Sequence, residues 1–185
     1  MDDQSLISIK LYGSKPLVFD AKVVEQLRCD YRIIGSLTGT LPRFPLQNKF
    51  LGLPLVLMPE EVTLLLSKKI AYIETSTDIP TWIYPLTDMD RLRYQVYKYL
   101  WSQSFYITGG AKFGGDYLAY PGDPMRFHSQ YIIGVYQPKA SLTSLDIITL
   151  GRLATNVKKT YVLATSDEQE GEADVQLFSL QWAGF

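Results

Sequence analysis

The pattern of hydrophobic and polar positions divides the chain into two α/β units. In the first unit, residues 5–12 alternate between apolar and polar as a half-buried strand does, and Asp20 is placed to cap a helix. Ile33 and its neighbour predict the start of another strand, and the glycines and prolines of residues 35–48 predict a loop. Pro59 and the two glutamates after it favour the first turn of a second helix.

The second unit begins at Thr87 with a capping box, which predicts a helix of about fifteen residues. Clusters of β-branched and aromatic residues predict about five strands, and Thr143 caps a second helix. The fold class is therefore α/β of the α+β type, with a mixed sheet flanked by helices in the second unit. We predict an N-terminal domain at 1–75, a linker at 76–87 and a C-terminal domain at 88–185.

Composition excludes two classes of protein. The 185-residue chain is 46% hydrophobic and 20% charged, which excludes a disordered chain. The most apolar stretch, residues 50–58, is too short to cross a bilayer, and the first residues lack the layout of a signal peptide. We therefore expect no membrane span. Because the chain has one cysteine and one histidine, it has no zinc-site spacing, and we expect neither a metal nor a cofactor.

Charge is distributed unevenly along the chain, although the formal net charge is only −1. Residues 88–160 hold 9 basic and 5 acidic side chains, whereas residues 161–185 hold 5 acidic side chains and no basic ones. A segment of net charge +4 suits a polyanion such as nucleic acid. Arg91, Arg93 and Lys98 share one side of the predicted helix, where they are either solvated or hold phosphates.

The only histidine, His128, lies in a stretch rich in glycine, tyrosine and turn residues at 113–131. Residues 117–120 predict a short strand that ends at Tyr120, and residues 121–124 predict a turn. His128 begins the next predicted strand, so the phenol and the imidazole lie at the same end of a hairpin and face one cleft. A lone histidine is more often structural than catalytic, and the residues alone leave both interpretations open.

Three stretches resemble a known family. They are FGGDYLAYPGDPMRFHSQYI, GRLATNVKKTYVLAT and SLQWAGF, which are similar to the catalytic block, the lysine block and the C-terminal strand of the tRNA-splicing endonucleases. The chain most resembles the smaller catalytic subunit of the eukaryotic enzyme, which cuts the 3′ splice site. This resemblance implies that Tyr120, His128 and Lys159 form the catalytic triad. Lys158 is the neighbouring alternative, and the family's spacing from the histidine favours Lys159.

The chemistry that the resemblance implies is attack of an RNA 2′-hydroxyl on the adjacent phosphorus. A histidine, with an ordinary pKa of about 6.5, suits a general acid, whereas a tyrosine, with an ordinary pKa of about 10, is a poor base unless a cation stabilises its phenolate. By resemblance, Tyr120 is the general base, His128 is the general acid and Lys159 stabilises the transition state. The expected products are a 2′,3′-cyclic phosphate and a 5′-hydroxyl, and no metal is required.

Four further residues are candidates for substrate binding. Lys112, Arg126 and Arg152 are candidate phosphate contacts. Trp182 either stacks on a flipped base or packs in a core or an interface, where a tryptophan of a final strand is more often found.

The resemblance also implies partners. The family works as a four-subunit complex, so we expect pre-tRNA, a second catalytic subunit and a small structural partner that binds through the C-terminal strand, in the nucleus or on the cytoplasmic face of the mitochondrial outer membrane. The apolar residues 175–185 suit such an interface. The alternatives are a non-catalytic scaffold or RNA-binding subunit, and a homo-oligomeric enzyme of the archaeal type. The intact triad residues argue against the first and the YPGDPMRFH match argues against the second.

Overall fold

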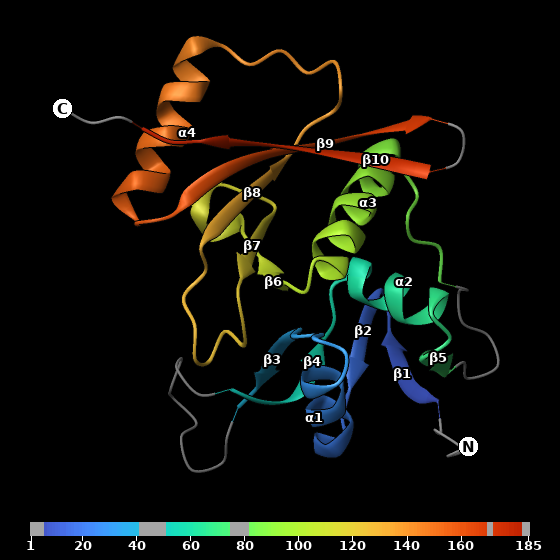
Figure 1. Ribbon diagram of the computed structural model, residues 1–185. Coiled ribbons are helices and arrows are strands. Elements are labelled where there is room, and N and C mark those ends of the chain that lie inside the picture. The colour runs from blue at the N-terminus through green and yellow to red at the C-terminus, as the bar shows by residue number, and fades with distance from the viewer. Residues whose placement is uncertain (1–5, 41–50, 75–81, 170–171, 183–185) are drawn as a thin grey trace. The chain divides into compact units, whose positions relative to one another are not determined.

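The computed structural model describes residues 6–40, 51–74, 82–169 and 172–182 (Figure 1). The chain forms two compact units, residues 1–86 and 87–185. Both units combine helices with a five-stranded sheet, which confirms the predicted α+β class. Every helix in the described part of the chain is too short or too polar to span a membrane.

The sheet of the first unit has the order β3-β4-β2-β1-β5, in which β1 and β5 are parallel and the other pairs are antiparallel. Its elements are β1 (Ile7–Tyr12), β2 (Lys15–Val18), α1 (Ala21–Cys29), β3 (Ser36–Gly39), β4 (Gly52–Val56), α2 (Pro59–Ser67) and β5 (Ala71–Glu74). The predicted strand at Ile33 was wrong. Ile33 and Ile34 are buried in a connection, and β3 lies inside the predicted loop because it pairs with β4, a partner distant in sequence.

A buried carboxylate explains that difference. Glu61 accepts hydrogen bonds from the backbone amides of Ile34 at 3.1 Å, of Gly35 at 3.0 Å and of Met58 at 2.7 Å. The first two bonds hold the connection against the start of α2, and the third caps that helix. Since Ile34 and Gly35 give their amides to a side chain, a strand ladder cannot use them.

Residues 82–86, which the sequence places in a linker, belong to the first unit. The Trp82 indole donates to the Thr63 hydroxyl at 2.9 Å, and the Tyr84 hydroxyl donates to the Glu60 carboxylate at 2.8 Å. Both partners lie on α2, so this segment is fixed to the helix by side-chain bonds.

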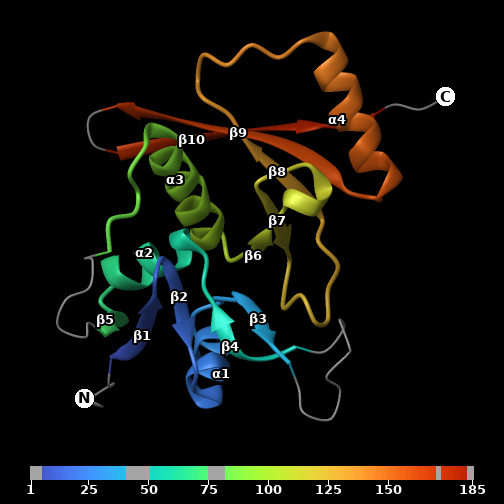
Figure 2. The ribbon, with the colours of Figure 1, turned by 180° about the vertical axis from the view of Figure 1, so that it is seen from behind.

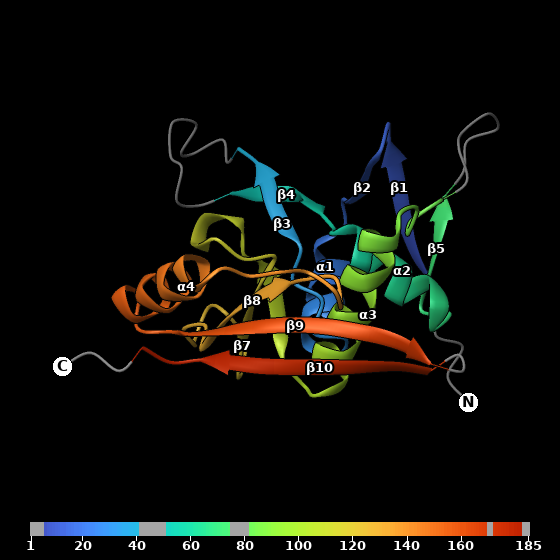
Figure 3. The ribbon, with the colours of Figure 1, turned by 90° about the horizontal axis from the view of Figure 1, so that it is seen from above.

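The sheet of the second unit has the order β10-β9-β8-β7-β6, with β8 and β9 parallel and the other pairs antiparallel (Figure 2). Its elements are α3 (Asp88–Ser102), β6 (Tyr106–Gly109), the short 3₁₀ helix η1 (Ala111–Phe113), β7 (Tyr117–Tyr120), β8 (Tyr131–Val135), α4 (Ser144–Asn156), β9 (Thr160–Gln169) and β10 (Glu172–Leu180). The long strands β9 and β10 run side by side (Figure 3), and β10 forms one edge of the sheet.

The two helices of this unit cover opposite faces of its sheet. Tyr117 and Leu118 are neighbours in β7 and therefore point to opposite faces. The Tyr117 ring contacts the Tyr97 ring of α3 with centroids 5.8 Å apart, whereas Leu118 lies in a buried cluster with Ala154 of α4. The predicted capping boxes begin both helices, with Thr87 at α3 and Thr143 at α4.

Candidate active site at one end of the second sheet

Three neighbouring strands, β7, β8 and β9, have a terminus at the same end of the second sheet. In the antiparallel pair β7–β8, Ala119 lies opposite Tyr131, and the Gln130 amide donates to the Ala119 carbonyl at 3.0 Å. In the parallel pair β8–β9, Tyr131 lies opposite Thr160, whose amide donates to the Gln130 carbonyl at 3.0 Å. The end of β7, at Tyr120, and the starts of β8 and β9 therefore lie at the same end of the sheet, with β8 between the other two strands.

A tight turn returns the chain from Tyr120 to β8. The Asp123 carboxylate accepts from the Met125 amide at 2.7 Å, and the Asp123 carbonyl accepts from the amides of Arg126 and Phe127 at 2.8 and 3.0 Å. His128 follows this turn and is exposed. It was expected to begin the strand, but β8 begins three residues later, because the turn lasts until Phe127 and ladder pairing starts only with the Gln130 backbone.

Lys159 lies between the end of α4 and the start of β9. Lys158 before it has a left-handed backbone with φ 55°, and the Lys159 amide donates to the Ala154 carbonyl at 2.9 Å, which ends the helix. The Lys159 ammonium donates to the Ser129 carbonyl at 3.0 Å and stands 5.6 Å from the centre of the Phe113 ring. Of the two lysines, Lys159 is thus the one whose charge reaches the segment that follows the histidine.

The Tyr120 side chain is half-buried at the rim of the core. Its ring packs against the buried cluster that contains Leu118 and Ile132, and its hydroxyl oxygen accepts a hydrogen bond from the Thr108 hydroxyl at 3.3 Å. The phenol is thus held by its ring against the core and by its hydroxyl against Thr108 of the neighbouring strand β6.

The four candidate binding residues fall in three places. Arg126 is exposed in the same turn as the histidine, and Lys112 is exposed in η1, next to Phe113. The guanidinium of Arg152, on α4, lies 5.2 Å from the centre of the Trp182 ring, which follows β10. The structure therefore brings Arg152 and Trp182 into one cation–π pair, with the indole still 39% exposed.

Comparison with known proteins covers both units. Residues 7–76 match the family model for the TSEN34-like N-terminal domain, and residues 91–175 match the model for the catalytic C-terminal domain of tRNA intron endonuclease. The chain belongs to the tRNA-splicing endonuclease family. This confirms the family predicted from the sequence, and it makes the second unit an endoribonuclease domain of that family.

Relatives of the tRNA-splicing endonuclease family match at different extents. The chain is 28% identical to the probable tRNA-splicing endonuclease subunit sen34 of Schizosaccharomyces pombe over the full length of both chains. It is 45% identical over 92 residues to the human tRNA-splicing endonuclease subunit Sen34, a match covering 50% of this chain and 29% of the human one. It is 34% identical over 92 residues to the tRNA-splicing endonuclease of Methanopyrus kandleri, covering 50% and 51%. The match thus spans under a third of the human relative.

Basic residues on α3 of this endonuclease domain have structural partners. Arg93 forms an ion pair with Asp116 at 2.9 Å, and the second carboxylate oxygen of Asp116 accepts from the Val135 amide at 2.8 Å. Arg91 pairs with Asp88. The sequence left open whether these arginines are solvated or hold phosphates, and their observed role is to join α3 to its own first turn and to the sheet.

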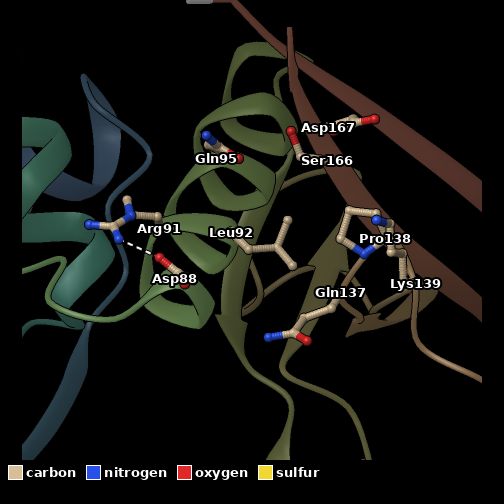
Figure 4. A pocket seen from close by; sticks show the side chains of 9 residues that line it. All are labelled: Asp88, Arg91, Leu92, Gln95, Gln137, Pro138, Lys139, Ser166 and Asp167. Carbon is tan, nitrogen blue, oxygen red and sulfur yellow. Dashed lines mark hydrogen bonds and ion pairs between the residues drawn. The ribbon is translucent and has the colours of Figure 1, made fainter.

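A pocket of about 460 Å³ opens beside α3, away from the sheet end just described (Figure 4). Charges of both signs line it, and Tyr120, His128 and Lys159 are absent from its lining, which consists of Asp88, Arg91, Leu92, Gln95, Gln137, Pro138, Lys139, Ser166 and Asp167. Across the described ranges, no three His, Cys, Asp or Glu side chains are grouped to hold a metal ion.

Sequence reasoning missed three contacts of the site: the Thr108 hydroxyl, the Ser129 carbonyl and the Phe113 ring. Phe113 is the first residue of the stretch 113–131 that contains His128. Its contact with Lys159 depends on how η1 folds back, with Gly114 in a left-handed conformation at φ 71°. Thr108 meets Tyr120 only because β6 pairs with β7 in the observed register. No local signal in the sequence encodes either contact.

Proposed function

We propose that this chain is a catalytic subunit of a tRNA-splicing endonuclease, which cleaves the 3′ splice site of intron-containing pre-tRNA. The observation that carries the proposal is the convergence of Tyr120, the segment after His128, and Lys159 at one end of three adjacent strands. A phenol, an imidazole and an ammonium ion can supply the base, the acid and the charge stabilisation that cleavage by the RNA's own 2′-hydroxyl requires.

In the proposed reaction, the phenolate of Tyr120 removes the proton of the 2′-hydroxyl, and the 2′-oxygen attacks the adjacent phosphorus. The bond from phosphorus to the 5′-oxygen breaks, and the His128 imidazolium gives its proton to that oxygen. Lys159 offsets the negative charge that grows on the non-bridging oxygens. The products are a 2′,3′-cyclic phosphate and a 5′-hydroxyl. Because side chains carry both proton transfers, we propose that the reaction is independent of metal.

Substrate contacts are proposed around this centre. Arg126 shares the turn that precedes His128, and Lys112 is next to the Phe113 ring that faces Lys159, so both suit contacts to phosphates near the cut. The pair formed by Arg152 and Trp182 offers a planar cation and an exposed indole, which together suit a base that is turned out of its stack.

We propose that the chain acts within a hetero-oligomer that contains a second catalytic subunit and structural subunits. Two relatives are named as subunits of a tRNA-splicing endonuclease, which supports this proposal. The edge strand β10 also supports a partner bound through the C-terminal strand, because Leu177 and Phe178 are 39% and 56% exposed there. The location proposed with this function is the nucleus or the cytoplasmic face of the mitochondrial outer membrane, on the family resemblance alone.

The test is cleavage of an intron-containing pre-tRNA in EDTA by the reconstituted complex, with both cut sites mapped. His128→Ala and Lys159→Ala should abolish the 3′ cut and leave the 5′ cut intact. Lys158→Ala is the matched control and should cut both sites normally, because Lys158 is exposed and it is the Lys159 ammonium that reaches the Ser129 carbonyl. Normal cutting of both sites by His128→Ala would favour a scaffold subunit instead.

A further inference from the structure

A tyrosine needs help to act as a base near neutral pH. A phenol ordinarily has a pKa of about 10, so its phenolate has to be stabilised by a nearby cation or by a hydrogen-bond donor. Lys159 is the expected cation, but its ammonium already donates to the Ser129 carbonyl at 3.0 Å. A second hydrogen-bond donor, held in place by the sheet, would stabilise the phenolate in addition to Lys159.

The edge strand β6 supplies such a donor. In its antiparallel pairing with β7, Tyr106 lies opposite Tyr120 and Thr108 lies opposite Leu118, so Thr108 and Tyr120 are diagonal neighbours on one face. The Thr108 hydroxyl donates to the phenol oxygen at 3.3 Å. This distance is long for a bond between hydroxyls, and such bonds shorten when the acceptor becomes charged.

Both partners of this bond are held rigidly. The Tyr120 ring packs against the buried cluster of the endonuclease domain, and threonine is stiff about its first side-chain torsion because it is β-branched. The bond therefore costs little additional ordering of side chains when the phenolate forms.

We propose that Thr108 is a positioning residue of the active site, which orients the Tyr120 phenol and stabilises its phenolate through this hydrogen bond. The inference rests on the proposed function, because it assigns a role to Thr108 only if Tyr120 is the general base. In this role Thr108 acts through Tyr120 and transfers no proton itself.

The variants are Thr108→Val, which keeps the shape and removes the donor, and Thr108→Ser, which keeps the donor. In the reconstituted complex, single-turnover cleavage of the 3′ site by Thr108→Val should be about tenfold slower at saturating enzyme, because one hydrogen bond to a charged group is lost. The enzyme concentration that gives half-saturation should not change. The rise of the cleavage rate with pH should occur at a higher pH in Thr108→Val than in the parent. Thr108→Ser should stay within about threefold of the parent rate.

Thr165→Val is the matched control. Thr165 lies in β9 of the same sheet, and its buried hydroxyl has no hydrogen-bond partner among the described residues, so the substitution should leave the 3′ rate unchanged. Equal losses for the Val variants of Thr108 and Thr165 would point to packing and would overturn the inference.

A double-mutant cycle with Tyr120→Phe separates the two levels of the proposal. Tyr120→Phe should slow the 3′ cut far more than Thr108→Val does, and the residual single-turnover rate of Tyr120→Phe should be the same with and without Thr108→Val. If Thr108→Val still slows cleavage tenfold in that background, Thr108 acts through the fold and the inference fails. If Tyr120→Phe is inactive while Thr108→Val is normal, the inference fails and the proposed function stands. If Tyr120→Phe cuts the 3′ site normally, the proposed base is wrong, and the role of Thr108 fails with it.

Discussion

Replacing Gly134 of β8 by alanine, the smallest possible substitution, should cause a large loss of stability. A Cβ atom at this position would lie 2.3 Å from the Tyr161 hydroxyl oxygen and 2.8 Å from the Tyr136 ring. Tyr161 is only 1% exposed, and its hydroxyl donates to the Gly114 carbonyl at 3.1 Å. Burial, followed by its hydrogen bond with Tyr136, raises the pKa of Tyr161, so this hydroxyl stays protonated and remains a donor.

The size of the effect follows from these contacts. Non-bonded atoms pack best roughly 3.5 Å apart, so Gly134→Ala forces the Tyr161 ring or the β8 backbone to move by about 1 Å. Overpacking of this kind costs about 1–3 kcal/mol, and loss of the buried bond to Gly114 adds about 1 kcal/mol. We therefore expect the unfolding free energy of the second unit to fall by about 2–4 kcal/mol.

The assay is urea unfolding of the chain, with amide hydrogen exchange in β8 and β9 reporting on the second unit. Gly109→Ala is the control, because a Cβ atom there would have no neighbour within 4 Å. In a Tyr161→Phe background, Gly134→Ala should cost less, since the nearest atom has been removed. A Gly134→Ala variant within about 0.5 kcal/mol of the parent, or one with the same cost in both backgrounds, would refute the reasoning.

Two further predictions concern the buried acid Glu61 and the ring beside Lys159. Burial raises the pKa of Glu61 to about 7, so between about pH 4.5 and 7 the folded chain holds a proton that the unfolded chain has lost. The free energy of unfolding should therefore fall by about 3 kcal/mol as the pH rises from about 4.5 to above 7. Glu61→Gln should remove this pH dependence in urea titrations. Under the proposed function, Phe113→Leu removes the ring that lies 5.6 Å from the Lys159 ammonium and should slow the 3′ cut about threefold to tenfold, whereas Phe113→Tyr keeps an aromatic ring and should stay near the parent rate; equal losses for the two variants would contradict this role.

The elements that could be predicted are those encoded by residues close together in sequence. The capping boxes at Thr87 and Thr143 predicted the starts of α3 and α4, because each box is formed within four residues. Strand β3 was missed because its register depends on β4 and on the hydrogen bonds that Glu61 accepts from the preceding connection. The start of β8 was placed too early, since residue preferences do not reveal where a turn as tight as that at Asp123 ends.

In the candidate site, too, local features could be predicted and contacts between distant residues could not. A hairpin pattern predicted that Tyr120 and His128 belong to the same end of a hairpin, and in the structure Tyr120 ends β7 while His128 lies in the connection before β8. The choice of Lys159 over Lys158 needed the family resemblance, and the structure adds a physical distinction, because the left-handed backbone of Lys158 turns the chain before Lys159 enters β9. The contact from Thr108 depends on strand register alone, and it was beyond sequence reasoning for that reason.

The topology of the second sheet accounts for the position of the site. Because β8 and β9 are parallel, both strands begin at the same end of the sheet, and because β7 is antiparallel to β8, β7 ends there. Pairing among buried strands therefore brings the strand ends next to Tyr120, His128 and Lys159 to one end of the sheet. A change that shifts the register of β8 by one residue would move the segment after His128 relative to the ends of β7 and β9, and it would exchange the β8 side chains between the two covered faces of the sheet. Preserving the core of this sheet and preserving the geometry of the site are thus the same requirement.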